Sequence, residues 1–224
     1  MILKNDTPEY EYLYPGPGRV YKYRGEYYPG ITSVLNGFKI KKSDWVHDAA
    51  KIGTICHNDI SKRRDGKAID KEIMIWTVPQ KEVYAAIRRF RQMWARINVT
   101  PIDVEIPIIY ADPDNKYIRY SSRIDLIYKQ DGYGVLSDIK TGNWYDHYPM
   151  QLAAAYQAVK DEYDIQRCSI LRCDINLDRN PDAIPEVILF DIPAIEELIP
   201  EFNKMCIEYN KLLEKWIANF KEEK

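Results

Sequence analysis

The fold is decided by the stretch from Arg123 to Tyr156, which reads RIDLIYKQDGYGVLSDIKTGNWYDHYPMQLAAAY. It begins with an apolar run at residues 124–128, which is typical of a β-strand. Asp131-Gly132 follows, a dipeptide that favours a two-residue hairpin turn because its backbone tolerates positive φ. A second strand is expected from Tyr133 to Lys140, and a helical pattern begins near Asp146. The stretch therefore predicts a β-hairpin followed by a helix.

The turn sets the register of this hairpin and places four charged residues on one face. If the dipeptide supplies both loop residues, Asp125 lies directly across from Asp138, and Arg123 lies across from Lys140. Side chains alternate between faces along a strand, so all four are expected on the same face. Directly opposed Cβ atoms are about 5 Å apart, and like charges at that distance are destabilising. The two carboxylates therefore need something that offsets their repulsion.

A divalent cation would offset it. Mg²⁺ is typically held by one or two carboxylates together with water and substrate phosphate. Lys140 next to such a site is a natural partner for a phosphate group or for the attacking water. The sequence thus predicts a Mg²⁺ or Mn²⁺ site at Asp125 and Asp138.

At these residues the sequence resembles the PD-(D/E)XK nuclease superfamily. The likeness rests on Asp125, on Asp138-Ile139-Lys140, and on Gln151 in the following helix. It is greatest to the RecB-like branch, which includes phage exonucleases and mitochondrial genome maintenance exonucleases. The resemblance implies an α/β restriction-endonuclease-like core, with a central mixed β-sheet flanked by helices. It also implies that the backbone carbonyl of Ile139 helps to hold the metal and that Gln151 orients the substrate.

Two more segments carry the resemblance. The run from Pro29 to Leu35 looks like the opening of phage and mitochondrial members, and Gly53-Thr54-x-x-His57 looks like the motif in which a histidine reaches the metal. The family often has a glutamate on the strand before the first catalytic aspartate. By resemblance Glu105 is a candidate active-site carboxylate, and an exposed glutamate on an edge strand is the alternative.

Substrate contacts are expected from Gln151, Arg123, Tyr156 and Trp144. Relatives typically have a tyrosine four residues after the glutamine, whereas Tyr156 is five residues after Gln151, about 140° further round the helix. Trp144 lies just past the catalytic strand with Tyr145 and Tyr148. These three aromatic residues either stack on bases or pack the loop.

The length and composition are those of a globular protein. A chain of 224 residues suits one domain, here expected as a hairpin and helical part (1–100), a catalytic sheet core (101–192) and a C-terminal helix (193–224). The net charge of −2 means that DNA contacts must come from local basic patches. No leader-like N-terminus and no membrane-length apolar run is evident, so we expect a cytoplasmic location in bacteria or phage-infected cells.

The four cysteines are expected to be free thiols. Some RecB-like nucleases hold an iron–sulfur cluster with one cysteine before the core and three after it. Cys56, Cys168, Cys173 and Cys206 match that count but not the spacing. Buried thiols are therefore expected, with no iron–sulfur cluster.

The remaining elements follow from turn residues and hydrophobic periodicity. We expect an N-terminal hairpin turning at Arg24-Gly25-Glu26 and a short helix capped by Thr32 or Ser33. The other predictions are helices from Ser43 and at 79–97, strands at 101–108, 117–128, 167–175 and 184–191, and one helix at 193–220.

The expected function is metal-dependent hydrolysis of DNA in phage or bacterial recombination or repair. The exonuclease label comes from the resemblance alone, and an endonuclease of the same superfamily is open. A rival from another class is a catalytically silent or partner-dependent DNA-binding module on the nuclease fold. A third is an exonuclease subunit that works with a recombination partner protein.

Overall fold

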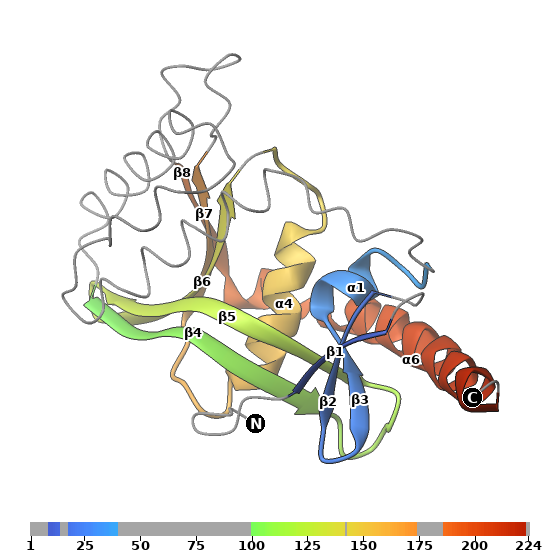
Figure 1. Ribbon diagram of the computed structural model, residues 1–224. Helices are drawn as coiled ribbons and strands as arrows, with labels where there is room; N and C mark the ends of the chain where they lie inside the picture. The colour runs from blue at the N-terminus through green and yellow to red at the C-terminus, as the bar shows by residue number, and fades with distance from the viewer. Residues whose placement is uncertain (1–8, 14–17, 40–99, 142, 174–185, 223–224) are drawn as a thin grey trace, which may run out of the picture.

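A five-stranded mixed β-sheet forms the centre of the computed structural model, which describes residues 9–13, 18–39, 100–141, 143–173 and 186–222. The strands lie in chain order, with the third and fourth parallel and all other neighbours antiparallel. Figure 1 shows the sheet with helix α4 across one face. The strands are β4 (Thr100–Ala111), β5 (Arg119–Gln130), β6 (Tyr133–Thr141), β7 (Arg167–Cys173) and β8 (Glu186–Asp191). The expected mixed α/β architecture is therefore present.

The central hairpin has the predicted register. Asp131 and Gly132 are the two loop residues, and both have positive φ, at 52° and 87°. The β5–β6 ladder runs from the pair Gln130 and Tyr133 to the pair Leu126 and Ser137. The turn chemistry was thus sufficient to place these two strands against each other.

A crossover through α4 (Tyr148–Val159) joins the parallel strands β6 and β7. Parallel neighbours need such a connection, because a tight turn can only join antiparallel strands. The buried side of α4 is rich in alanine and includes Ala153, Ala154 and Ala158, so the helix can lie close to the sheet. The hydroxyl of buried Tyr120 donates a hydrogen bond to the Ala154 carbonyl at 2.8 Å and lies 3.1 Å from Gln157 Oε1. These contacts fix α4 against β5.

A second sheet of three antiparallel strands packs beside β5. It contains β1 (Glu9–Leu13), β2 (Gly18–Tyr23) and β3 (Glu26–Pro29). The predicted hairpin is confirmed, with its turn at Arg24-Gly25, which have φ values of 49° and 82°. A parallel bridge between Gly30 and Ser121 links this segment to the main sheet.

The short helix α1 (Ile31–Leu35) is confirmed, but its expected cap is wrong. Gly30 is the N-cap, and no side chain caps the helix. Thr32 and Ser33 lie inside the first turn, and the Ser33 hydroxyl donates instead to the Arg19 carbonyl. The hydroxyl is therefore used to hold α1 on β2.

The C-terminal segment forms two helices rather than the single one predicted. They are α5 (Ile192–Glu196) and α6 (Ile199–Glu222). Pro200 lies in the first turn of α6, where its missing N–H costs nothing. In a continuous helix the same proline would lose a backbone hydrogen bond and clash with the Glu196 carbonyl, so the break falls just before it.

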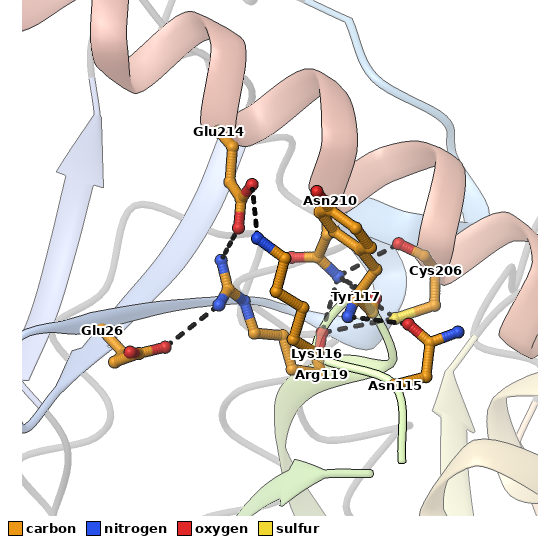
Figure 2. Close-up of polar contacts among 8 residues, drawn as sticks. All are labelled: Glu26, Asn115, Lys116, Tyr117, Arg119, Cys206, Asn210 and Glu214. Atoms are coloured by element: carbon orange, nitrogen blue, oxygen red, sulfur yellow. Dashed lines mark hydrogen bonds and ion pairs between the residues drawn. The ribbon is translucent and has the colours of Figure 1, made fainter. Parts of the chain in front are cut away.

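Helix α6 is held to the start of β5 by a polar cluster, shown in Figure 2. The Asn210 amide nitrogen donates to the carbonyls of Tyr117, Arg119 and Cys206 at 2.9, 2.9 and 3.0 Å. The Arg119 guanidinium bonds to Glu26 from β3 and to Glu214 from α6, each at 3.0 Å. One arginine therefore connects both sheets with the C-terminal helix.

Two hydrophobic clusters in the described part of the chain include residues of β5, β6 and β7. The larger one joins the sheet to α1, α4, α5 and α6 and includes Tyr120, Leu136, Ile170 and Phe202. The second is formed by the buried side chains of Leu126, Tyr128, Val135, Ile139 and Leu171. Both sides of β5 and β6 are thus apolar, as is typical of central strands.

Some predictions lie outside the described residues. These are the helices from Ser43 and at 79–97, the thiol of Cys56 and the motif that contains His57. Of the other cysteines, Cys168 and Cys206 are buried free thiols, as expected. Among the helices in the described ranges, none has both the length and the apolar character that a membrane crossing requires.

Candidate active site

The site begins where the β5–β6 ladder ends. The last ladder pair is Leu126 and Ser137, so Asp125 and Asp138 are the next residues along the two strands. Beyond that point the Asp125 carboxylate takes the place of a backbone partner, because its Oδ2 accepts the Ile139 N–H at 2.7 Å. Both aspartates are 9% exposed. Two nearly buried carboxylates are thereby brought together from neighbouring strands.

Asp138, Lys140 and Gln151 form a closed hydrogen-bonded group. The Lys140 ammonium lies 2.5 Å from Asp138 Oδ2 and donates to Gln151 Oε1 at 2.9 Å. The Gln151 amide nitrogen donates to Asp138 Oδ1, also at 2.9 Å. Each of the three side chains contacts the other two. The predicted lysine and glutamine therefore lie where they can act together with Asp138.

The position of Gln151 follows from the start of α4. His147 is the N-cap, Pro149 lies in the first turn, and the Gln151 N–H bonds back to the His147 carbonyl. Proline suits this turn because its nitrogen needs no intrahelical partner. The first turn of α4 therefore presents the glutamine to the end of β6, where Asp138 and Lys140 lie.

Tyr148 covers Lys140 from the same turn. The lysine Nζ lies 4.6 Å from the centroid of the Tyr148 ring, within the range of a cation–π contact. The Tyr148 hydroxyl donates to the Asn143 carbonyl at 3.1 Å. Burial raises the pKa of Tyr148 to about 12, and the nearby Asp138 charge acts in the same direction. The phenol is therefore protonated at neutral pH and remains a hydrogen-bond donor.

The strand opposite Asp125 is strained at Glu105. This residue has a φ of 50°, which is costly for a side chain with a Cβ atom. Val104 packs in one hydrophobic cluster and Ile106 in the other, although residues two apart normally share a face. On β5, Leu126 and Ile124 are also two residues apart and also pack in different clusters. The two-strand ribbon therefore reorients beside Asp125, as at the bulges found next to many active sites.

Glu105 and Arg123 interact with each other. Arg123 Nη1 lies 3.6 Å from Glu105 Oε2, and the arginine side chain is 58% exposed. The β5–β6 ladder ends before it reaches Arg123 and Lys140, so the expected pairing of these two residues is not part of it; on the β4 side Arg123 pairs with Pro107. The long β4–β5 ribbon continues past the site without β6, and Arg123 lies on that extension.

Two of the expected substrate contacts are directed toward the core. Tyr156 is 7% exposed, and its hydroxyl contacts Glu196 of α5 at 3.4 Å, so it does not join the group around Lys140. Trp144 packs against the larger hydrophobic cluster and meets Tyr148 edge to face at 5.6 Å. The loop-packing alternative therefore describes Trp144. Its neighbour Tyr145 is 52% exposed.

Arg172 is a cation near the site that the sequence analysis missed. It pairs with Lys140 in the parallel register of β6 and β7, and its charge acts on the Tyr148 phenol. Its guanidinium also bonds to Glu186 of β8 at 3.1 Å. Placing Arg172 beside Lys140 from the sequence would have required the parallel register of β6 and β7. That register depends on how the α4 crossover packs.

The donor set of the site fits a hard divalent cation. Asp125 and Asp138 supply carboxylate oxygens from adjacent strands, which suit Mg²⁺ or Mn²⁺. Within the described ranges no three His, Cys, Asp or Glu side chains gather as a ready-made metal cage. A metal at Asp138 competes with Lys140 for the same carboxylate. The predicted ligand His57 lies outside the described residues.

Comparisons with known proteins add little to this geometry. No family model and no curated protein matches the chain. The crystal structure of SSO0001 aligns over 77% of this chain and 80% of that one, with 14% identity and a TM-score of 0.33. That of VC1899 from Vibrio cholerae covers 70% of this chain and 52% of that one, with 8% identity and a TM-score of 0.25. We therefore infer the function from the site.

Proposed function

We propose that this chain is a metal-dependent nuclease that hydrolyses DNA phosphodiester bonds, and that it acts as an exonuclease in phage or bacterial recombination or repair. One observation carries the proposal: Lys140, Asp138 and Gln151 form a closed group beside the Asp125 carboxylate. The restriction-endonuclease-like core and the RecB-like resemblance belong to the same proposal. The exonuclease mode rests on that resemblance.

The residues of the chain have distinct roles in this proposal. Asp125 and Asp138 would hold Mg²⁺ or Mn²⁺, which lowers the pKa of a bound water and neutralises charge that develops on the phosphate. The Lys140 ammonium would orient or deprotonate the attacking water, or would stabilise the negative charge that develops on the phosphate. Gln151 keeps the ammonium in position through its Oε1 atom. Burial of both carboxylates lowers the local dielectric constant and so strengthens these interactions.

One observation favours a catalytically silent or partner-dependent DNA-binding module. Both oxygens of Asp138 already have protein partners, Gln151 at Oδ1 and Lys140 at Oδ2. The Lys140 ammonium thus offsets the charge of Asp138 without a metal. The two functions differ in whether the protein binds Mn²⁺ at Asp138 and in whether it cleaves DNA.

The deciding experiment follows end-labelled linear DNA, single- and double-stranded, with Mg²⁺, Mn²⁺ or EDTA. We expect metal-dependent degradation by the wild type and a loss of roughly 10²- to 10⁴-fold in Lys140→Ala, the usual range for a positioned acid or base. Lys129→Ala, which removes an exposed lysine near the hairpin turn, is the matched control. Circular DNA separates the two modes, because an exonuclease requires an end.

Full activity of Lys140→Ala would contradict the mechanism. Calorimetric titration with Mn²⁺ then separates the nuclease from the silent module. Binding that weakens in both Asp125→Asn and Asp138→Asn supports the paired site. Absence of cleavage, together with unchanged Mn²⁺ binding in these two variants, favours the silent module.

A further inference from the structure

We propose that Tyr145 and His147, which stack on each other beside Lys140, form the surface on which the base next to the scissile phosphate stacks. The substrate at this position is then an unpaired nucleotide of a DNA strand. This inference rests on the proposed nuclease function and names the form of DNA that the site accepts.

The Tyr145–His147 pair has the geometry of a stacking surface. The ring centroids of the two residues are 5.7 Å apart, and the rings are inclined by only 22°. Tyr148 supports both from beneath, because its centroid lies 5.5 Å from that of Tyr145 and 5.3 Å from that of His147, with steep interplanar angles of 74° and 84°. The two rings and Tyr148 are therefore in mutual contact, and the near-parallel pair presents a flat surface.

The pair lies one ring away from the candidate catalytic lysine. Tyr148 contacts the Lys140 ammonium with its ring face and meets both rings of the Tyr145–His147 pair at steep angles. A base attached to a phosphate that binds at Lys140 is therefore within one ring's width of this pair. Phosphate and base contacts to the same nucleotide become possible within a single loop and helix turn.

Exposure singles out Tyr145 among the aromatic residues of this loop. Trp144 and Tyr148 pack against the larger hydrophobic cluster, whereas Tyr145 is 52% exposed. A comparably exposed tyrosine, Tyr133, is covered by the Arg167 guanidinium at 5.0 Å from its ring centroid. Tyr145 contacts aromatic rings instead, and a base can extend that stack.

The chemistry of the pair favours an unpaired base of any sequence. Every base has a π-face, so stacking tolerates all four bases, whereas a paired base must first leave its duplex. Burial lowers the pKa of His147, and the Lys140 charge lowers it further. The imidazole is therefore an uncharged aromatic ring at neutral pH, suited to a base rather than to a second phosphate.

The binding experiment uses single-stranded DNA with 2-aminopurine at successive positions from its end, mixed with the Lys140→Ala protein so that no cleavage occurs. We expect fluorescence quenching at one position. Adding Tyr145→Ala should remove the quenching and weaken binding by roughly five- to 150-fold, the range for one lost base stack. Tyr145→Phe should restore both, and Tyr133→Ala is the matched control.

Cleavage assays distinguish a failure of the stacking surface from a failure of the proposed nuclease function. With catalytically competent protein, an abasic site at the quenched position should slow the wild type but leave Tyr145→Ala unaffected. Metal-dependent cleavage that Lys140→Ala abolishes, with equal abasic effects in the wild type and Tyr145→Ala, overturns the stacking surface alone. Quenching that depends on Tyr145 without any cleavage supports the surface and overturns the nuclease. Cleavage of duplex DNA without binding of the single strand overturns the stacking surface alone. Absence of both strand binding and cleavage overturns both proposals.

Discussion

At the scale of single residues, Gln151 has a role that only an amide can fill. Its nitrogen donates to Asp138 and its oxygen accepts from Lys140. A carboxylate cannot donate in this way, and an apolar side chain can do neither. The glutamine therefore sets the distance between the lysine and the aspartate as well as contacting both.

We expect Gln151→Glu to lower the rate of DNA cleavage by roughly 10- to 100-fold, the usual effect of losing a residue that orients a metal ligand. The new carboxylate repels Asp138 and draws Lys140 away from it. Single-turnover rates on labelled DNA would measure the change, with thermal melting as a check on folding. Gln130→Glu, at the end of β5, is the control, and equal rates in the two variants would refute the role.

Several residues of the candidate site were predicted from the sequence because the turn sets the hairpin register. Asp125, Asp138 and Lys140 were placed from Asp131-Gly132 alone, and the observed ladder has that register up to the edge of the site. The left-handed backbone of Glu105 was not predicted, since nothing local requires it. Its φ is imposed by the reorientation of two strands.

At the scale of elements, α6 depends on one buried amide. Asn210 is fully buried and donates to two carbonyls of the segment that leads into β5 and to one of its own helix. Tyr117 lies before β5, and Arg119 is the first residue of the strand. The side chain therefore satisfies backbone groups that the sheet does not.

We expect Asn210→Ala to lower the free energy of unfolding by about 1–3 kcal/mol, because it removes the side-chain donor of the Tyr117 carbonyl and leaves the Arg119 carbonyl with only the Cys206 thiol. Urea-induced unfolding would measure the loss (Figure 2 shows the contacts). Glu208→Ala, an exposed position on the same helix, is the control and should change stability little. A similar stability for both variants would show that α6 is held mainly by its apolar face.

Element boundaries were predicted less well where two influences compete. The apolar periodicity of the C-terminal segment continues across Pro200, and it predicted one helix. The structure has two, since the proline removes a hydrogen bond that periodicity does not register. The cap of α1 failed for a similar reason, because the Ser33 hydroxyl has a tertiary partner in Arg19.

At the scale of the whole molecule, two buried thiols make the free energy of unfolding depend on pH in the alkaline range. Cys168 on β7 and Cys206 on α6 belong to the same hydrophobic cluster. Burial raises the pKa of each thiol from 9.0 to about 12. The folded protein therefore keeps both protons in a range where the unfolded chain releases them.

The sign of the effect follows from proton binding. Between about pH 9 and about pH 12 the unfolded chain binds fewer thiol protons, so the free energy of unfolding falls as the pH rises. Urea titrations under reducing conditions, from about pH 8 to about pH 11, would measure this slope. The variant Cys168→Ala/Cys206→Ala should have lower stability at neutral pH but a shallower slope. An identical slope would assign the effect to other groups.

Short-range chemistry was enough to predict the central hairpin, the strands around it and the residues that it carries. Turn dipeptides restrict the backbone directly, and alternation along a strand assigns faces without knowledge of the rest of the chain. The resemblance added Gln151, and the structure places this residue against Lys140. All of these features depend on segments that are adjacent in sequence or joined by one turn.

Long-range packing settled the features that the chain alone left open or placed wrongly. Arg172 lies beside Lys140 because β7 pairs in parallel with β6, and Arg123 turns to Glu105 because β5 outlasts its ladder with β6. Tyr145 remains exposed while Trp144 packs inward. The physical reason is common to these cases. Each contact depends on how separate strands, helices and loops pack together, and the local conformational preferences of the backbone do not determine that packing.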